Sequence, residues 1–370
     1  MSSPSSRLRV AQITASSAIG GGPEHVWQLL RHLPDKRIEC FVAAPRRWPY
    51  QERFESIVGS DRFQSLPQRR WSTAAFAQLV CWLRARRIEL IHSHGRGAGL
   101  YGRLAALLTG IPCVHSFHGI HPPQEWLSRV TYLALERSLA RINCTSVAVS
   151  PSEGKLAADL GLQGRRQLVI PNGVVVDDYP ARCLLHSPFK VVHVSRFDAA
   201  KNSEALLPIA RAMRTQGLLE RCRFLVVGEG EGRVPLETAL ASEGLLRSFC
   251  FTGPQDEVRP LLYGAGCYLS TSRGEGLPLA VLEAQAEGLP VVASRVTGNV
   301  DAVVDGVTGF LFPLDDANAA ADGIRQLMNN GALRERMGLA AQQHIRENHD
   351  VRRMALVMAE LYASTVGSEM

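Results

Sequence analysis

Residues 267–293 read CYLSTSRGEGLPLAVLEAQAEGLPVVA. Two short apolar runs, Cys267–Ser270 and Pro290–Ala293, flank an amphipathic segment at Pro278–Glu287. Strands that are buried on both faces and separated by a helix are typical of the βαβ units of a parallel sheet. Pro278 stands where the helix should begin, a position at which its missing N–H is harmless. The stretch therefore predicts an α/β fold.

The same alternation continues over the whole chain. The other expected strands are Leu8–Thr14, Glu39–Ala43, Leu90–His92, Pro112–Ser116, Ser146–Val149, Leu168–Ile170, Lys190–Ser195, Arg223–Val227, Phe249–Thr252 and Gly309–Phe312. The pattern restarts after Asp177–Pro188, which we interpret as a linker because it holds two prolines. A chain of 370 residues also exceeds what one hydrophobic core usually serves. We therefore predict two Rossmann-like parallel-sheet domains facing each other across a cleft, at 1–180 and 189–340.

Composition narrows the class of protein. The apolar fraction of 46% and the charged fraction of 21% are ordinary for a globular domain. The first ten residues, MSSPSSRLRV, lack the apolar region of a secretory signal, and we find no apolar run of the roughly 18 residues that a membrane span needs. We therefore expect a cytoplasmic protein. Nucleic acid is a poor partner, because aromatic content is 6% and no basic run carries interleaved stacking residues.

The charge is unevenly distributed. Residues 1–180 hold 22 Lys and Arg against 13 Asp and Glu, a net charge of +9, whereas the rest carries −3. This basic half is either a solvated face or a surface attracted to anionic lipid headgroups or a phosphate-bearing acceptor. The segment Trp126–Ile142 mixes apolar residues and arginines at helical spacing, and it fits a peripheral membrane helix or a core-facing helix. Both alternatives stay open.

The eight cysteines show no CxxC spacing. Cys113, Cys250 and Cys267 lie inside apolar runs, so we predict buried free thiols rather than disulfides or a zinc site.

The most informative polar residues follow the strand at Cys267–Ser270. A glycine-bearing turn leads there into a helix start, whose free N–H groups and dipole favour a diphosphate. Glu275 precedes the helix and Glu283 lies within it, so the two carboxylates can address different hydroxyl groups of one extended ligand. The alternative is a surface acid and a helix-facing acid without a ligand.

Three further groups follow expected strands. Arg196 and Lys201 come after Lys190–Ser195, where two cations can neutralise a diphosphate leaving group in place of a metal ion, unless they are merely solvated. Gly20–Gly22 allow the backbone to approach a phosphate or sugar closely, or form a plain tight turn. His115, His118 and His121 lie at or just past the strand Pro112–Ser116, where a histidine can hydrogen-bond a sugar hydroxyl; isolated histidines are usually structural, and the residues alone do not choose among the three.

Taken in order, these motifs resemble the retaining glycosyltransferase family 4 (glycosyl transferases group 1) of the GT-B fold. The resemblance spans about residues 8 to 350. It rests on the following elements: the Glu275-x7-Glu283 pair, Arg196 with Lys201, the early glycine loop, His118-Gly119, Ser150, Pro171-Asn172-Gly173-Val174 and Val227-Gly228-Glu229-Gly230.

The resemblance implies a role for each matching position. Glu283 would hold the nucleotide ribose, Glu275 the donor sugar, and His118 the sugar beside its anomeric carbon. Arg196 and Lys201 would hold the diphosphate. The remaining donor-binding positions are Gly21, Gly22, Thr252, Gly276, Leu277 and Leu279. The final helices, residues 341–370, would pack back on the first domain.

The implied reaction moves a hexose from a nucleotide diphosphate sugar, by family default a UDP-sugar, to a hydroxyl of a glycan or lipid-linked acceptor, with retention. No cofactor and no metal is expected. The protein would act in the cytoplasm, peripherally on the inner membrane face, in polysaccharide or lipopolysaccharide synthesis. Alternatives are a nucleotide-sugar epimerase of the same fold and a nucleotide-sugar-binding protein without turnover. A nicotinamide dehydrogenase is disfavoured, because neither half carries a complete dinucleotide fingerprint.

Overall fold

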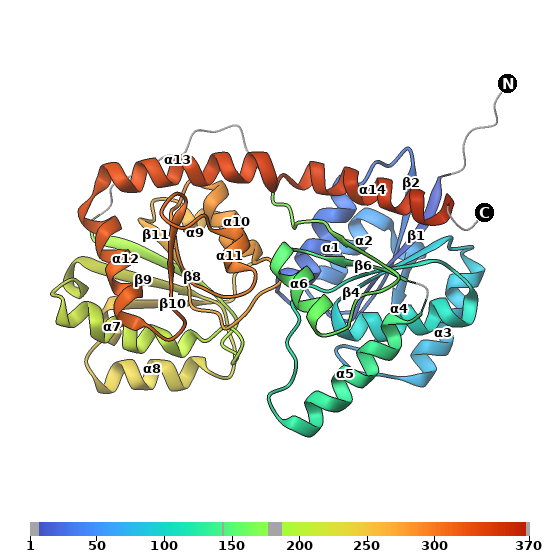
Figure 1. Cartoon of the computed structure of the whole chain (residues 1–370), viewed down its shortest axis with the longest axis horizontal. Coiled ribbons are helices and arrows are strands. Elements are labelled where there is room, and N and C mark those ends of the chain that lie inside the picture. Colours follow the sequence, from blue (N-terminus) through green and yellow to red (C-terminus); the bar gives the residue numbers. More distant parts are fainter. Residues whose placement is uncertain (1–6, 143, 177–186, 368–370) are drawn as a thin grey trace. The chain divides into compact units, whose positions relative to one another are not determined.

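The computed structural model describes residues 7–142, 144–176 and 187–367 (Figure 1). It divides the chain into a first unit, residues 1–173 with 351–370, and a second unit, residues 174–350. Most of the predicted linker, residues 177–186, lies outside the described residues. Among the helices that are described, none is both long and apolar enough to cross a bilayer.

The first unit is built on a seven-stranded parallel sheet with strand order β3-β2-β1-β4-β5-β6-β7. Its strands are β1 (Leu8–Thr14), β2 (Ile38–Ala44), β3 (Phe63–Ser65), β4 (Leu90–His94), β5 (Cys113–Ser116), β6 (Cys144–Ala148) and β7 (Arg166–Val169). Its helices are α1 (Gly21–His32), α2 (Tyr50–Val58), α3 (Thr73–Ala85), α4 (Gly95–Thr109), α5 (Trp126–Ala140), α6 (Pro151–Asp159) and α14 (Val351–Gly367). Every residue of β4 is buried, as expected for a central strand covered on both faces.

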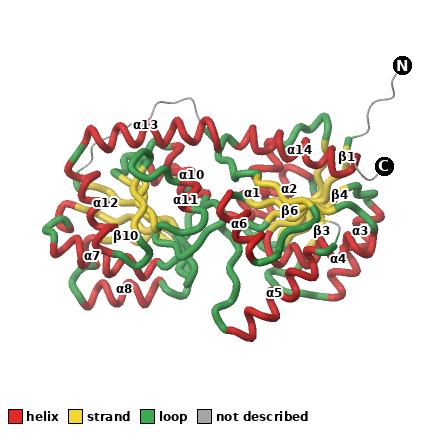
Figure 2. The backbone as a smooth tube through the Cα atoms, viewed as in Figure 1, coloured by secondary structure: helices red, strands yellow, loops and turns green. Residues whose placement is uncertain are grey.

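The second unit repeats this plan with a six-stranded parallel sheet of order β10-β9-β8-β11-β12-β13. Its strands are β8 (Phe189–Val194), β9 (Cys222–Val227), β10 (Phe249–Gly253), β11 (Cys267–Ser270), β12 (Val291–Ser294) and β13 (Gly309–Phe312). Its helices are α7 (Leu206–Thr215), α8 (Arg233–Ser242), α9 (Arg259–Leu262), α10 (Leu279–Ala286), α11 (Asn299–Ala302), α12 (Ala317–Asn329) and α13 (Gly331–Asn348). In each unit the strands lie inside and helices cover them (Figure 2).

The C-terminal segment contributes to both units. Helix α13 belongs to the second unit and contacts α10, whereas α14 belongs to the first and packs against α1. Tyr362 of α14 is fully buried, and its hydroxyl lies 2.6 Å from His92 Nδ1 and 3.0 Å from Gln12 Nε2. These hydrogen bonds tie the end of the chain to β1 and β4.

Two features differ from the sequence predictions. Strand β3 was not predicted, because its three residues are too few to show a periodic pattern. The prediction of buried thiols holds for Cys113, Cys222 and Cys267 but is wrong for Cys250, which is exposed. Cys250 lies on β10, the edge strand of its sheet, where alternate side chains point away from the core. Cys81 on α3 is exposed as well, and the six cysteines whose side chains are described are free.

Candidate donor site

The signature loop of the second unit joins β11 to α10. Ser270 ends the strand, residues 271–278 form the loop, and Leu279 begins the helix. Pro278 is therefore the N-cap residue rather than part of the first turn, and no side chain caps this helix start. Val281 N–H and Leu282 N–H both donate to Pro278 O at 3.1 Å, so the predicted anion site at this helix start would use the amides of Leu279 and Ala280, and it stays a prediction.

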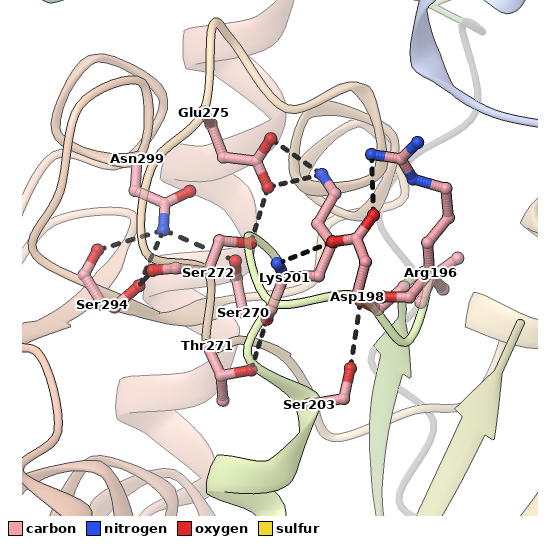
Figure 3. A network of polar contacts seen from close by, with 12 residues as sticks. Arg196, Asp198, Lys201, Ser203, Ser270, Thr271, Ser272, Glu275, Ser294 and Asn299 are labelled. Atoms are coloured by element: carbon pink, nitrogen blue, oxygen red, sulfur yellow. Dashed lines mark hydrogen bonds and ion pairs between the residues drawn. The ribbon is translucent and has the colours of Figure 1, made fainter. Parts of the chain in front are cut away.

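Two of the predicted site residues, 74 positions apart in the sequence, are in direct contact. Lys201 Nζ donates to both carboxylate oxygens of Glu275, at 2.6 and 2.8 Å (Figure 3). Ser272 Oγ donates to the same carboxylate at 2.6 Å. The Lys201 side chain is 25% exposed and that of Glu275 is 10% exposed, so the pair is largely shielded from water. Coulomb attraction is stronger in such a setting than at an open surface.

Arg196 is held beside this pair by an acid that the sequence analysis did not single out. Arg196 Nη2 lies 3.1 Å from Asp198 Oδ2, and Asp198 Oδ1 accepts the backbone N–H of Lys201 at 3.1 Å (Figure 3). Asp198 therefore shapes the turn that presents both cations. An aspartate that accepts the N–H three residues further along is the pattern of a capping side chain, a signal which could have been recognised in the sequence.

The loop that carries Glu275 is held from behind by β12 and α11. Asn299 Nδ2, which is buried, donates to the backbone oxygen of Ser294 at 3.0 Å, and Ser294 Oγ donates to the backbone oxygen of Ser272 at 2.5 Å. The N–H of Glu275 donates to Thr297 O at 2.9 Å. Gly298 has φ +80°, and a Cβ there would lie 2.7 Å from Gly276 O, so the close approach of the two loops requires glycine.

The Val227-Gly228-Glu229-Gly230 motif supports the backbone on either side of Arg196. A Cβ on Gly228 would lie 1.9 Å from Ser195 O, and Phe197 N–H donates to Glu229 O at 3.2 Å. The glycines let this turn pack directly on the backbone that carries Arg196. The motif therefore supports the site through its backbone.

Other predicted donor-binding residues surround the same strand ends. Glu283 is the fifth residue of α10. Burial is the largest cause that raises the pKa of Tyr268, and the negative charges of Glu275 and, to a smaller extent, Glu283 raise it further. Both acids therefore lie close enough to affect the ionisation of the buried Tyr268 hydroxyl, which donates to Val194 O at 3.1 Å. Thr252 lies near the end of β10. Gly276, Leu277 and Leu279 are buried at the loop and helix start.

Three predicted residues belong to the first unit. Gly21 and Gly22 form the first turn of α1, and no atom would lie within 4 Å of a Cβ on Gly22. Packing therefore does not require glycine there. His118 has a positive φ of 60°, which is unfavourable for a non-glycine residue. Its neighbour Gly119 donates an N–H to Glu153 Oε1 at 2.5 Å, and the buried Glu153 also accepts the N–H of Val149 at Oε2, while its own N–H donates to the N-cap Ser150 Oγ at 3.2 Å.

Comparisons with known proteins indicate the family of this chain. The sequence pattern of "Glycosyl transferases group 1" matches residues 183–344, and that of "Glycosyltransferase Family 4" matches residues 19–178. The UDP-Gal:alpha-D-GlcNAc-diphosphoundecaprenol alpha-1,3-galactosyltransferase of Escherichia coli is 22% identical over 352 residues, which cover 90% of this chain and 91% of the relative. Sulfoquinovosyl transferase SQD2 of Arabidopsis thaliana is 26% identical over 362 residues, covering 90% of this chain and 68% of that protein.

Among solved structures, Anabaena Alr3699/HepE in complex with UDP and glucose is similar with a TM-score of 0.82 at 19% identity, covering 97% of this chain and all of that one. The predicted fold class, two Rossmann-like parallel sheets of the GT-B type, is confirmed.

Proposed function

Because this chain belongs to glycosyltransferase family 4, it is a retaining glycosyltransferase that uses a nucleotide sugar, and we propose that it moves a hexose from a UDP-sugar to a hydroxyl of a lipid-linked glycan. The observation that carries this proposal is the contact between Lys201 and Glu275. It joins a cation suited to a diphosphate and a carboxylate suited to sugar hydroxyls at one point of the second unit. The E. coli relative is named for a UDP-sugar donor, and the HepE structure holds UDP and glucose.

The ion pair suggests how the donor would enter. Diphosphate oxygens compete with Glu275 for the Lys201 ammonium, and they also meet Arg196, which is 46% exposed. Once Lys201 turns to the diphosphate, the Glu275 carboxylate is released to accept hydrogen bonds from the donor sugar. Glu283 holds the ribose. The open amide end of α10 stabilises the diphosphate further.

The transfer itself places charge where these groups lie. As the bond to the anomeric carbon breaks, negative charge grows on the departing diphosphate, and Arg196, Lys201 and the amides of Leu279 and its neighbours stabilise it. The acceptor hydroxyl attacks from the side that the diphosphate leaves, and the departing phosphate takes its proton. The family resemblance assigns a sugar contact to His118 and donor contacts to Gly21 and Gly22 of the first unit, where no atom lies within 4 Å of a Cβ built on Gly22. The step requires no metal.

The lipid-linked acceptor is supported by helix α5. Trp126 is 74% exposed and Leu127 is 59% exposed, and Val130 and Leu135 are exposed as well. Arg129 and Arg137 are exposed on the same helix. Exposed apolar side chains flanked by arginines suit the surface of an anionic bilayer. This favours the peripheral-membrane alternative for the segment, and it would place the protein on the inner membrane face in cell-surface glycan synthesis.

The membrane contact is tested by sedimentation with vesicles that contain phosphatidylglycerol. Replacing Trp126 and Leu127 by serine should lower the bound fraction, whereas Val234→Ser, at an exposed position on α8, should not. Equal binding of all three proteins would remove α5 from the proposal.

The transferase activity is tested with a panel of nucleotide sugars, with and without a lipid-diphosphate glycan acceptor. Release of the nucleotide only when the acceptor is present supports transfer. An isomeric nucleotide sugar would indicate an epimerase, and tight binding without turnover a binding protein. In the same assay Arg196→Ala should weaken donor binding and transfer about tenfold, through loss of a charge-assisted contact. Arg211→Ala, which breaks only the exposed ion pair with Glu243, is the matched control.

A further inference from the structure

Three histidines of the first unit form a cluster. His25 lies on α1, His94 ends β4 and His118 follows β5. One ring nitrogen from each lies within 4.8 Å of the others, and His94 Nδ1 is 3.0 Å from His118 Nε2. The ring centroids of His25 and His118 are 4.4 Å apart. Three elements far apart in the sequence thus bring three imidazoles to one point.

Hydrogen bonding within the protein explains only part of this cluster. His94 Nε2 lies 2.8 Å from Gln12 Oε1, which fixes the ring and directs Nδ1 toward His118. His25 differs, because it is 2% exposed and neither of its ring nitrogens has a partner at hydrogen-bond geometry among the described residues. Asn172 lies close enough to raise the pKa of His25 slightly, but it does not offset burial, which lowers that pKa to about 4. A buried polar group without a well-formed hydrogen bond costs about 1–3 kcal/mol.

The chemical state of the cluster suits a metal ion. The amide oxygen of Gln12 can only accept a hydrogen bond, so the proton of the neutral His94 ring lies on Nε2 and the lone pair lies on Nδ1, which faces His118. Neutral imidazole is the form that binds zinc and related ions. At zinc–nitrogen distances of about 2.0–2.1 Å, two ligands of a tetrahedral ion lie roughly 3.3 Å apart. The 3.0 Å between His94 Nδ1 and His118 Nε2 is near this value. A small rotation of the His25 ring would bring one of its nitrogens to a similar distance from the other two.

We infer that His25, His94 and His118 form a binding site for a divalent transition-metal ion of the zinc class. Gln12 serves as the partner that orients His94, as outer-shell groups do in known metal sites. His118 is only partly buried, so an ion can reach the cluster from the side of this residue. The ion has no place in the proposed transfer step. Given the proposed function, it would instead compete with the donor sugar for His118 and inhibit transfer.

The binding site is tested without any sugar substrate. The chelator-treated protein is titrated with Co²⁺, and its visible absorption is recorded, before Zn²⁺ is added to displace the Co²⁺. We expect one Co²⁺ per chain, with absorption bands typical of a low-coordinate site. His25→Leu should weaken binding more than about 100-fold, and Gln12→Ala about 10- to 100-fold. His344→Gln, which removes one ring of a separate histidine pair, His344 with His349, should bind as the wild type does.

Folding of each variant is checked by circular dichroism. His25→Leu replaces a poorly satisfied polar group with an apolar one, so it should remain folded, and His118→Ala at the partly buried position provides a second variant. Absence of Co²⁺ binding, or binding that is unchanged in both variants, overturns the metal site. Either result leaves the proposed transfer untouched, because that is measured with nucleotide sugar and acceptor.

Discussion

The two units place opposite kinds of chemistry at the carboxyl edge of a parallel sheet. In the first unit, His94 ends β4 and the partly buried His118 follows β5, and desolvation lowers the pKa of both imidazoles. In the second unit, the ends of β8 and β11 carry Lys201 and Glu275, which form an ion pair. The carboxyl edge of a parallel sheet is where ligands bind in such folds. The difference shows that the fold supplies the location, whereas burial and partners decide whether the site is neutral or ionic.

We expect the largest effect from Glu275→Ala, which tests the ion pair of the second unit. Loss of the carboxylate removes a sugar contact made at the reacting centre and leaves Lys201 free for the diphosphate. Turnover should fall about 100- to 1,000-fold, as when a transition-state hydrogen bond is removed, while nucleotide-sugar affinity is kept or rises. Steady-state kinetics together with donor titration measure both. Glu237→Ala, which breaks a surface ion pair with Arg233, should leave both unchanged, and an equal loss in the two variants would refute the role of Glu275.

A second test asks whether the ionic site depends on close backbone packing. Gly298→Ala places a methyl group against the loop of Glu275 at positive φ and should cost about 2–4 kcal/mol of unfolding free energy together with part of the turnover. Gly306→Ala has a similar φ of +75° but no atom within 4 Å, so it should cost about 1 kcal/mol. Urea denaturation of both variants compares them. Equal costs would mean that the loop yields easily and that the packing is not decisive.

A smaller effect tests whether neutral histidines are confined to the first unit. His193 of β8 is buried, with Nδ1 2.9 Å from Leu269 O and Nε2 3.1 Å from Ser203 Oγ, and burial lowers its pKa to about 4. The unfolded chain takes up this proton below about pH 6.5, whereas the folded chain does so only near pH 4. Wild-type stability should therefore fall by about 1–2 kcal/mol between pH 7 and pH 5 through this group.

His193→Gln removes that titration. The variant should be less stable than the wild type at pH 7, and the difference should shrink by the same amount at pH 5. Denaturation curves at the two pH values measure it. A difference that does not change with pH would show that His193 takes up its proton at the same pH in the folded and the unfolded protein.

Most strands and helices of the fold could be predicted from the sequence, because buried parallel strands and amphipathic helices each have a characteristic pattern of apolar residues. It did not reveal β3, which is held by its neighbour β2 rather than by its own pattern. Nor did it show the exposure of Cys250, which depends on the strand order that places β10 at an edge. Local pattern reports which residues can form a strand, whereas position in the sheet decides which faces are covered.

For the candidate site, the residues themselves indicated Arg196, Lys201, Glu275 and Glu283 as groups suited to an anionic sugar donor, since charge and the position after a strand can be read along the chain. The pairing of Lys201 with Glu275, the support from Asn299 and the meeting of His25 with His94 and His118 were decided only by tertiary structure. These contacts join residues that are distant in the sequence. Parallel strands bring their ends together only after the crossover helices have folded back on the sheet.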